Sequence, residues 1–253
     1  MTKISATIIT YNEEKNIKRC IESLDFVDEI VVVDSLSSDN TSTIAKELGA
    51  KVIEQKFLGH IDQKQLAVEN AKHDWILSLD ADEEVSPELK ASIVELIKKP
   101  LEYDAYEMKR VSFHLGRWIR HGGWYPDKKI RLFNRQKAYW GGYNPHDKVI
   151  VNGKVGMLDG DLKHYVFTDL RHNIDTNNSY SSIMAEDLYK KGKKFSYLKL
   201  FFKPVGKFLE VYIYKRGFLD GTAGFIIAVG ASYSMFLKFA KLWELERVKK
   251  EQV

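Results

Sequence analysis

The first hundred residues alternate apolar runs of strand length with stretches of helical periodicity, and this alternation constrains the fold more than any other feature. Strands that are joined through helices lie parallel in one sheet, with right-handed crossovers. We therefore expect an α/β protein with a mostly parallel sheet flanked by helices. The predicted strands span residues 4–9, 30–33, 51–54 and 75–79, and the predicted helices span residues 13–24, 41–48 and 63–71.

The chain after Pro100 loses this regular alternation. Short alternating runs and an Asn-Gly turn indicate further strands, joined by loops rich in Gly, Trp and Arg. No internal repeat, low-complexity segment or linker divides the sequence into independent domains. The predicted elements are strands at 103–111 and 129–133, a hairpin at 149–155 around the Asn152-Gly153 turn, and a polar helix at 174–191.

Two carboxylates follow the apolar run of residues 75–79, in the triplet Asp80-Ala81-Asp82. The carboxyl ends of parallel strands are where open α/β sheets bind ligands. Acidic residues after a strand also form turns, and Ser86-Pro87 predicts the start of a helix, so a purely structural role is the alternative. If the carboxylates bind a metal, the lack of cysteine clusters favours a hard cation, Mg²⁺ or Mn²⁺, held together with substrate phosphates.

Polar residues also follow the first two predicted strands. Thr10-Tyr11-Asn12-Glu13-Glu14 leads into the first predicted helix, whose free N–H groups could bind a nucleotide. Asn12 is equally well interpreted as a helix cap. Asp34 would lie beside this segment, where its carboxylate could accept a hydrogen bond from a base N–H. A turn followed by a helix cap explains Asp39 and Thr41 better than it explains Asp34.

A third region combines aromatic rings with charged side chains. Aromatic rings cover the apolar faces of sugars, while charged groups bind hydroxyls and phosphates. Each aromatic residue taken singly is better explained by core packing, so the indication comes from the cluster. The region contains Gly122-Gly123-Trp124-Tyr125-Pro126-Asp127, Arg131-Leu132-Phe133 and Pro145-His146-Asp147.

These motifs, taken in order, resemble the family 2 glycosyltransferases of the GT-A fold. The residues that carry this resemblance are Thr10-Tyr11-Asn12-Glu13-Glu14, Val33-Asp34-Ser35, Asp39, Thr41, Asp74-Trp75 and Leu79-Asp80-Ala81-Asp82-Glu83. The second half is similar to the bacterial branch that includes lipopolysaccharide core β-1,4-glucosyltransferases. That similarity lies in residues 122–127, Arg131-Leu132-Phe133, Trp140, His146-Asp147 and Gly217-Phe218-Leu219-Asp220-Gly221.

The resemblance implies a Rossmann-like GT-A domain and a reaction. The reaction is an inverting, Mg²⁺- or Mn²⁺-dependent transfer of glucose or another hexose from a UDP-sugar. The acceptor would be a hydroxyl of a lipopolysaccharide core or another lipid-linked glycan. The implied organisation is a nucleotide-sugar-binding half at residues 1–110, an acceptor-binding half at 111–170, and a helical, basic and apolar, membrane-associating extension at 171–253.

The resemblance also suggests roles for single residues. Asp82 is expected to bind the metal, and His164 either completes this site or is a structural histidine. Inversion needs a base that removes the proton of the acceptor hydroxyl, and Asp147 is expected in this role, with Asp127 as the second candidate. Branch relatives commonly have His-Glu at the His146-Asp147 position. The expected nucleotide-sugar contacts are Thr10, Tyr11, Asn12, Glu13, Asp34, Lys64, Asp80 and Ala81, and the expected acceptor or diphosphate contacts are Trp124, Arg131 and His146.

The C-terminal part carries the basic charge. From Glu186 to the end there are 14 Lys and Arg against 7 Asp and Glu, whereas the first 185 residues hold 25 against 28. Residues 221–237 form an uncharged run with basic residues on both sides, which we interpret as a segment lying on an anionic membrane surface. A spanning helix and a buried core or dimer helix are the alternatives. Nucleic-acid binding is not expected, because the basic excess accompanies an apolar segment.

The chain begins with residues that lead directly into a strand, which gives no indication of a signal peptide, and its single cysteine, Cys20, excludes an internal disulfide. We expect a cytoplasmic protein bound peripherally at the inner face of the cytoplasmic membrane, with oligomerisation left open. Two other functions are considered. A nucleotidyltransferase would have a glycine-rich phosphate loop where this chain has Tyr11-Asn12-Glu13. A non-catalytic sugar-binding or membrane scaffold protein would bind no nucleotide sugar.

Overall fold

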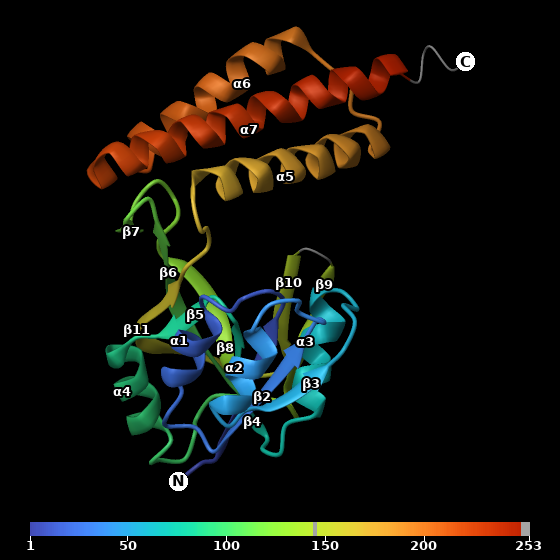
Figure 1. The fold of residues 1–253 in the computed structure, drawn as a ribbon. Coiled ribbons are helices and arrows are strands. Elements are labelled where there is room, and N and C mark those ends of the chain that lie inside the picture. Colours follow the sequence, from blue (N-terminus) through green and yellow to red (C-terminus); the bar gives the residue numbers. More distant parts are fainter. Residues whose placement is uncertain (144–145, 249–253) are drawn as a thin grey trace. The chain divides into compact units, whose positions relative to one another are not determined.

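The computed structural model describes residues 1–143 and 146–248, which form two compact units. Unit 1 comprises Met1–Val111 and Asp127–Tyr165, and unit 2 comprises Ser112–Pro126 and the chain from Val166 onwards. Each unit is therefore built from two separate stretches of the chain. Unit 1 contains most of a nine-stranded sheet, and unit 2 contains the long C-terminal helices (Figure 1).

The first half of the sheet is parallel and has the strand order β3-β2-β1-β4. The central strand β1 pairs in parallel with both β2 and β4, as the alternation of strands and helices predicts. Its side chains are almost all buried, because a parallel sheet is covered on both faces. The bounds are β1 (Ile4–Thr10), β2 (Glu29–Asp34), β3 (Lys51–Glu54) and β4 (Trp75–Asp80).

The second half of the sheet continues from β4 in the order β8-β6-β11-β5, with antiparallel pairs. Its strands are β5 (Glu83–Val85), β6 (Ala105–His114), β8 (Asp127–Asn134) and β11 (Val155–His164). In unit 2, β7 (Arg117–Ile119) pairs with the last residues of β6. The helices of unit 1 are α1 (Ile17–Glu22), α2 (Thr41–Glu47), α3 (His60–Glu69) and α4 (Pro87–Leu96).

The helix starts and stops of α2 and α4 follow local sequence chemistry. The Ser86 hydroxyl accepts a hydrogen bond from the Leu89 N–H (3.2 Å), and Pro87 occupies the first position of α4, as predicted. Leu89 and Ile93 of this helix are fully buried in the main core. Gly49, with a φ of +82°, follows the end of α2.

The first helix is shorter than predicted. It begins at Ile17 rather than at Glu13, and residues 13–16 form turns in which Asn16 and Ile17 both donate to the Glu13 carbonyl. The predicted apolar stripe is confirmed, since Ile17, Cys20 and Ile21 are buried against the sheet. The error therefore lies in where the helix starts, not in which face it buries.

The predicted hairpin at the Asn152-Gly153 turn is wrong. The strand before the turn, β10 (His146–Val151), pairs with β9 (Ala138–Tyr143) in a separate two-stranded sheet, while β11 after the turn joins the main sheet. Asp104 holds the turn, because its carboxylate accepts from the Lys154 N–H (2.9 Å) and its own N–H donates to the Lys154 carbonyl (2.9 Å). These long-range bonds replace the hairpin pairing.

Unit 2 is helical, apart from its short stretch of strand. Its helices are α5 (Leu170–Lys190), α6 (Tyr197–Leu209), a π-helical turn (Glu210–Tyr214), a 3₁₀ turn (Gly217–Asp220) and α7 (Gly221–Val248). The predicted polar helix is α5, which starts where Asp169 accepts a hydrogen bond from the His172 N–H (2.8 Å). Helix α7 lies between α5 and α6 and packs against both (Figure 1).

Helix α7 is the apolar segment noted in the sequence. The stretch Gly217–Arg247 is long and apolar enough to cross a membrane by length and composition alone. About a third of its most apolar part is buried within the protein. The core helix of a soluble protein also meets this test, so the segment alone is weak evidence for a membrane span.

Candidate active site

The carboxyl ends of β1, β2 and β4 place the predicted nucleotide-binding residues side by side. Thr10 pairs with Asp34 across β1 and β2, and Ile9 pairs with Asp80 across β1 and β4. Asp34 is buried, and its carboxylate accepts hydrogen bonds from the N–H (2.8 Å) and the hydroxyl (2.6 Å) of Ser37. A carboxylate has about four acceptor sites, so Asp34 can accept a further hydrogen bond from a ligand.

The loop after β1 is bonded to the loop after β2 through side chains. The N–H groups of Asn12 and Glu13 donate to the hydroxyls of Ser37 (2.9 Å) and Thr41 (2.8 Å). Asn12 adopts a left-handed φ of 53°, and its side-chain oxygen accepts from the Ser38 N–H (2.8 Å). The expectation of free N–H groups at this point is therefore wrong, because hydroxyls of the second loop already satisfy them.

Other groups of the same segment can meet a ligand. The Tyr11 ring is 60% exposed, and the buried Thr10 hydroxyl has no hydrogen-bond partner among the described residues. The pKa of Glu13 is raised, first by burial and also by the nearby carboxylate of Asp82. Buried polar groups without partners are rare in folded proteins, so the Thr10 hydroxyl has hydrogen-bonding capacity that a ligand could use.

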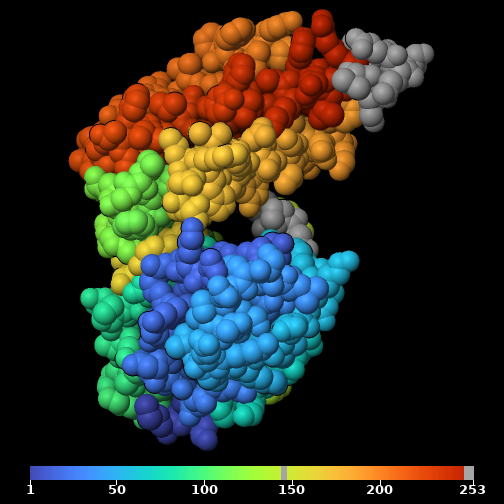
Figure 2. Space-filling view, viewed as in Figure 1, coloured from blue at the N-terminus to red at the C-terminus, as the bar shows by residue number. Residues whose placement is uncertain are grey.

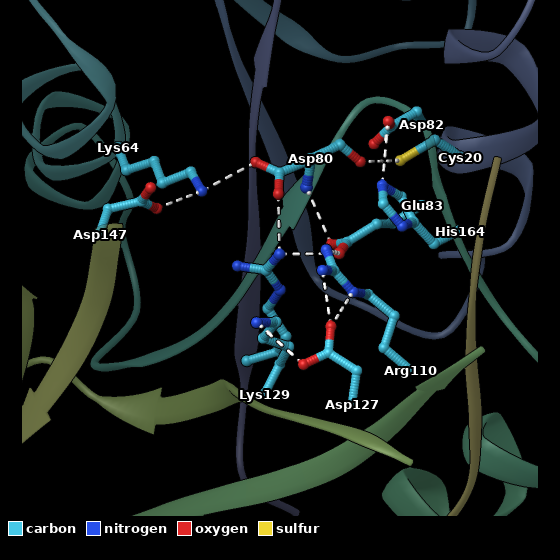
Figure 3. A network of polar contacts seen from close by, with 11 residues as sticks. Cys20, Lys64, Asp80, Asp82, Glu83, Arg110, Asp127, Lys129, Asp147 and His164 are labelled. Atoms are coloured by element: carbon cyan, nitrogen blue, oxygen red, sulfur yellow. Dashed lines mark hydrogen bonds and ion pairs between the residues drawn. The ribbon is translucent and has the colours of Figure 1, made fainter. Parts of the chain in front are cut away.

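Lys64, on α3, joins Asp80 to Asp147. Its ammonium nitrogen lies 2.9 Å from Asp80 Oδ1 and 2.8 Å from Asp147 Oδ2 (Figure 3). The Lys64 side chain is almost buried, and its nitrogen lies 4.4 Å from the centre of the Trp140 ring. These contacts bring Asp147, the first base candidate, to the carboxyl end of β4. We call Lys64, Asp80, Arg131 and Asp147 the strand-end cluster.

Arg131, on β8 beside β4, holds Asp80 from the other side. Its Nη2 lies 2.7 Å from both Asp80 Oδ2 and Glu83 Oε1. Glu83 Oε1 also accepts from Arg110 Nη1 on β6 (3.0 Å), and Arg110 Nη2 pairs with Asp127 Oδ2 (2.7 Å). Opposite charges therefore alternate along a chain of contacts that runs from one base candidate to the other (Figure 3).

Burial and neighbouring charge act in opposite directions on these carboxyls. Burial alone would raise the pKa of Asp80, but Lys64 and Arg131 outweigh it and hold that pKa well below its usual range. The pKa of Asp127 is also lowered, because the guanidinium of Arg110 outweighs its partial burial. Both carboxyls are therefore ionised at neutral pH.

Asp82 and His164 form the candidate metal site. Asp82 Oδ2 lies 3.2 Å from Nε2 of His164, the last residue of β11, and the Asp82 carbonyl accepts from the Tyr165 N–H (2.9 Å). Within residues 1–143 and 146–248, no group of three or more His, Cys, Asp or Glu side chains could hold a metal alone. One carboxylate and one imidazole could hold a Mg²⁺ or Mn²⁺ ion, for which substrate phosphate oxygens and water would supply the remaining ligands.

The three predicted acceptor or diphosphate residues have different surroundings. Arg131 lies in the strand-end cluster. Trp124 belongs to unit 2, where its ring stacks on that of His114 at a centroid distance of 5.8 Å and an angle of 10°. His146 begins β10, and its side chain lies outside the described part of the chain.

Glu83 and Arg110 take part in the site without having been predicted from the sequence. The Glu83 side chain is fully buried, and that of Arg110 is 16% exposed. Arg110 continues the inward alternation of Met108 on β6, and a charge at a core position requires an opposite partner. The charge of Arg110 at an inward position of β6 is the sequence feature that could have predicted this ion pair. Trp140, which contacts Lys64, was noted in the sequence only as part of the family resemblance.

Open α/β sheets bind ligands at the carboxyl ends of their parallel strands, and the acidic residues of this site lie at those ends. Residues 5–153 match the family model described as glycosyl transferase family 2, and this chain belongs to that family. It is 38% identical to an uncharacterized glycosyltransferase of Rickettsia typhi, over 97% of this chain and 88% of the relative. It is 29% identical to the lipopolysaccharide core biosynthesis glycosyltransferase LpsC of Rhizobium meliloti, over 97% and 94% of the two chains.

The fold is similar to that of a solved structure, S. aureus TarS. The TM-score is 0.51 at 19% sequence identity, over 72% of this chain and 40% of TarS. A shorter form, TarS 1-349 in complex with UDP-GlcNAc, gives a TM-score of 0.51 at 16% identity, over 99% and 92% of the chains. Together with the family match, this similarity confirms the predicted GT-A-like fold with flanking helices and a long apolar C-terminal helix.

Proposed function

We propose that this chain is an inverting glycosyltransferase that moves glucose or another hexose from a UDP-sugar to a hydroxyl of a lipopolysaccharide core or another lipid-linked glycan. The observation that carries the proposal is the convergence of Asp80, Asp82 and Asp147 at the strand ends of a family 2 chain. The similarity to LpsC supports a lipopolysaccharide core acceptor.

The donor nucleotide would bind over the ends of β1 and β2. Tyr11 offers an exposed ring to the base, and Thr10 offers an unpartnered hydroxyl. Asp34 would accept a base N–H, while the backbone of Asn12 and Glu13 is fixed by the second loop. Asp80 and Ala81 would lie along the ribose and diphosphate, with Asp80 kept anionic and fixed by the two cations that bind its two oxygens, Lys64 and Arg131.

A Mg²⁺ or Mn²⁺ ion would be held by Asp82 and His164. When bound, such an ion neutralises the negative charge that develops on a diphosphate leaving group. Asp82 suits this role better than Asp80, because both oxygens of Asp80 are already bound by cations of the protein. In the described part of the chain, the Asp82 carboxylate pairs with the His164 imidazole and with no Lys or Arg side chain.

The acceptor hydroxyl must lose a proton as it attacks the anomeric carbon in line with the departing diphosphate. We assign the role of the base that removes this proton to Asp147, which Lys64 holds beside Asp80. Asp127 is the second candidate, and its lowered pKa makes its carboxylate a weaker base. We assign Arg131 a positioning role on Asp80, because its Nη2 already binds the carboxylates of Asp80 and Glu83. Trp124 and His146 stay candidates for contact with the acceptor.

A lipid-linked acceptor would be met at the inner face of the cytoplasmic membrane, where this chain would bind peripherally through its C-terminal helices. The basic excess and the exposed apolar side chains of unit 2 support this location.

The proposal is tested by a donor screen. The full chain is incubated with UDP-, GDP- and TDP-sugars, with Mn²⁺ or with a chelator, and with membrane lipid extract as acceptor. We expect turnover of a UDP-sugar only with the metal. Asp82→Ala should abolish turnover while its circular dichroism is unchanged. Asp25→Ala, which removes an exposed carboxylate of the same unit, should retain it.

Turnover at the wild-type rate in Asp82→Ala would overturn the metal assignment. Preference for GDP- or TDP-sugars would overturn the donor class. If calorimetry detects no binding of UDP with Mn²⁺ present, the chain is a non-catalytic member of its family.

A further inference from the structure

Helix α6 has two apolar faces, and only one of them is used inside the protein. Leu200, Pro204 and Phe208 face the helical core of unit 2. The Pro204 carbonyl accepts a hydrogen bond from the Ser232 hydroxyl of α7 (2.9 Å), and the Phe208 ring lies 5.9 Å from that of Phe225. These contacts account for the packing of α6 against α7.

The second apolar face of α6 is open to solvent. Its residues recur at helical spacing on one side of the helix, and their exposed fractions range from 51% at Leu209 to 70% at Leu198. The stripe continues into the π-helical turn with Ile213 and Tyr214, which is 83% exposed. In the space-filling view, α6 (orange) lies at the outer surface of its unit (Figure 2). The stripe on α6 consists of Leu198, Phe201, Phe202, Val205 and Leu209.

Basic side chains border this stripe. Lys199, Lys203 and Lys207 follow one another along the adjacent side of α6, and with Leu198, Phe202 and other residues they line an open groove of about 670 Å³. Over residues 197–216 there are five Lys and Arg and a single acid, Glu210. The surface is thus apolar and cationic at once.

We infer that the exposed face of α6 and the π-helical turn binds the interface of an anionic lipid bilayer. An amphipathic helix with Phe and Leu on one side and lysines beside them lies in the plane of such an interface. The apolar stripe would enter the boundary of the acyl chains while the lysines meet lipid phosphates. A second copy of the chain fits less well, because two such faces would bring their lysines together.

This inference rests on the peripheral membrane contact proposed above for the C-terminal helices and centres that contact on α6. Helix α7 is tied to the polar helix α5, since the Lys241 ammonium donates to the Asn178 carbonyl (2.7 Å) and to the hydroxyls of Ser181 (2.8 Å) and Ser182 (2.7 Å). A bilayer-spanning α7 would carry the polar helix α5, which packs against it, into hydrocarbon, where polar and charged groups are costly. The buried side chains of α7 pack within unit 2, whereas Phe225, Val229 and Tyr233 stay 44–50% exposed and add to the apolar surface of that unit.

The test is flotation of the full chain with vesicles, which measures no sugar transfer and so can fail separately from the proposed function. We expect binding to vesicles of phosphatidylcholine with 30% phosphatidylglycerol, a composition chosen to be anionic, and weak binding to pure phosphatidylcholine. Phe201→Ser/Phe202→Ser should lower the partition coefficient by about tenfold or more, because two aromatic side chains no longer enter the acyl boundary. Lys199→Gln/Lys203→Gln should lower it by about tenfold on anionic vesicles only.

The matched control is Ile174→Ser/Ile183→Ser, which removes two exposed apolar side chains from α5 of the same unit. It should bind as the wild type does, with circular dichroism confirming that all variants are folded. Equal loss of binding in this control would overturn the assignment to α6. Equal binding to neutral and anionic vesicles would overturn the role of the lysines. Absence of vesicle binding, with a dimer seen by light scattering, would show that a second copy covers the face.

Discussion

At the scale of residues, Lys64 and Arg131 each lie between two carboxylates, and together they bind both oxygens of Asp80. Burying such charges is costly, so an ion network of this kind is weak evidence for stability. Its clearer effect is geometric. Asp80 and Asp147 cannot change their distance without breaking a contact to Lys64, and this fixes the base candidate relative to the strand end.

The two base candidates can be separated by measurement. Asp147→Asn should lower kcat by about 10²–10⁴-fold, the range for loss of a general base, with the KM for the donor changed by only a few-fold. Asp127→Asn removes a carboxylate that is weakly basic and paired with Arg110, and we expect a smaller loss. Steady-state kinetics with the UDP-sugar found in the donor screen checks both variants. If Asp127→Asn shows the larger loss in kcat, the base is Asp127.

The network also predicts how stability depends on pH. Asp80 has a lower pKa in the folded than in the unfolded chain. Its contribution to stability is therefore complete above the unfolded pKa of about 3.9 and is lost as the pH falls through the folded value. In urea unfolding below pH 4, the free energy of unfolding of the wild type should fall with pH. Asp80→Asn should make this slope shallower by up to about 1.4 kcal/mol per pH unit. An unchanged slope would show that Asp80 titrates alike in both states.

At the scale of elements, the sequence pattern predicted the strands whose formation depends on their own apolar residues. The parallel strands were predicted because β1, β2 and β4 are apolar runs buried in the sheet. The start of α1 was not predicted correctly, because the N–H groups before it bond to side chains 25 to 28 residues away in the chain. The hairpin failed for the same reason, since Asp104 holds the turn from a distance of 50 residues in the chain.

Gly160 gives a test of packing between elements. It adopts a φ of +99° in β11, and a β-carbon there would overlap the Leu89 nitrogen and lie 2.6 Å from the Leu89 Cα at the start of α4. Gly160→Ala should lower the free energy of unfolding by about 2–5 kcal/mol, from backbone strain and overpacking together. Gly206→Ala in α6 is the control, since no described atom lies within 4 Å of its β-carbon. It should be neutral or stabilise by up to about 1 kcal/mol. Similar unfolding midpoints for the two variants in urea would contradict this packing argument.

At the scale of the whole molecule, the sequence predicted the part of the site that strand order determines. The parallel strands β2 and β4 bring Asp34 and Asp80 to either side of β1, so their place at the same edge of the sheet follows from the order of elements. The ion network does not follow, because it depends on β8 and β6 being inserted after β4 in the sheet. Only this insertion brings Arg131 and Arg110 to Glu83.

The division into two units predicts that chemistry and membrane binding can be impaired separately. The strand-end cluster belongs to unit 1, whereas the exposed face of α6 belongs to unit 2. Phe201→Ser/Phe202→Ser should therefore keep hydrolysis of the UDP-sugar within about twofold of wild type, because no group of the cluster is altered. Transfer to an acceptor embedded in vesicles of membrane lipid extract should fall by about tenfold or more, in line with the lost partitioning. Adding detergent to disperse the acceptor should restore most of the transfer, because the reaction then needs no bilayer contact. An equal loss of hydrolysis and transfer in this variant, without rescue by detergent, would contradict the separation and indicate that α6 supports the fold of the catalytic unit.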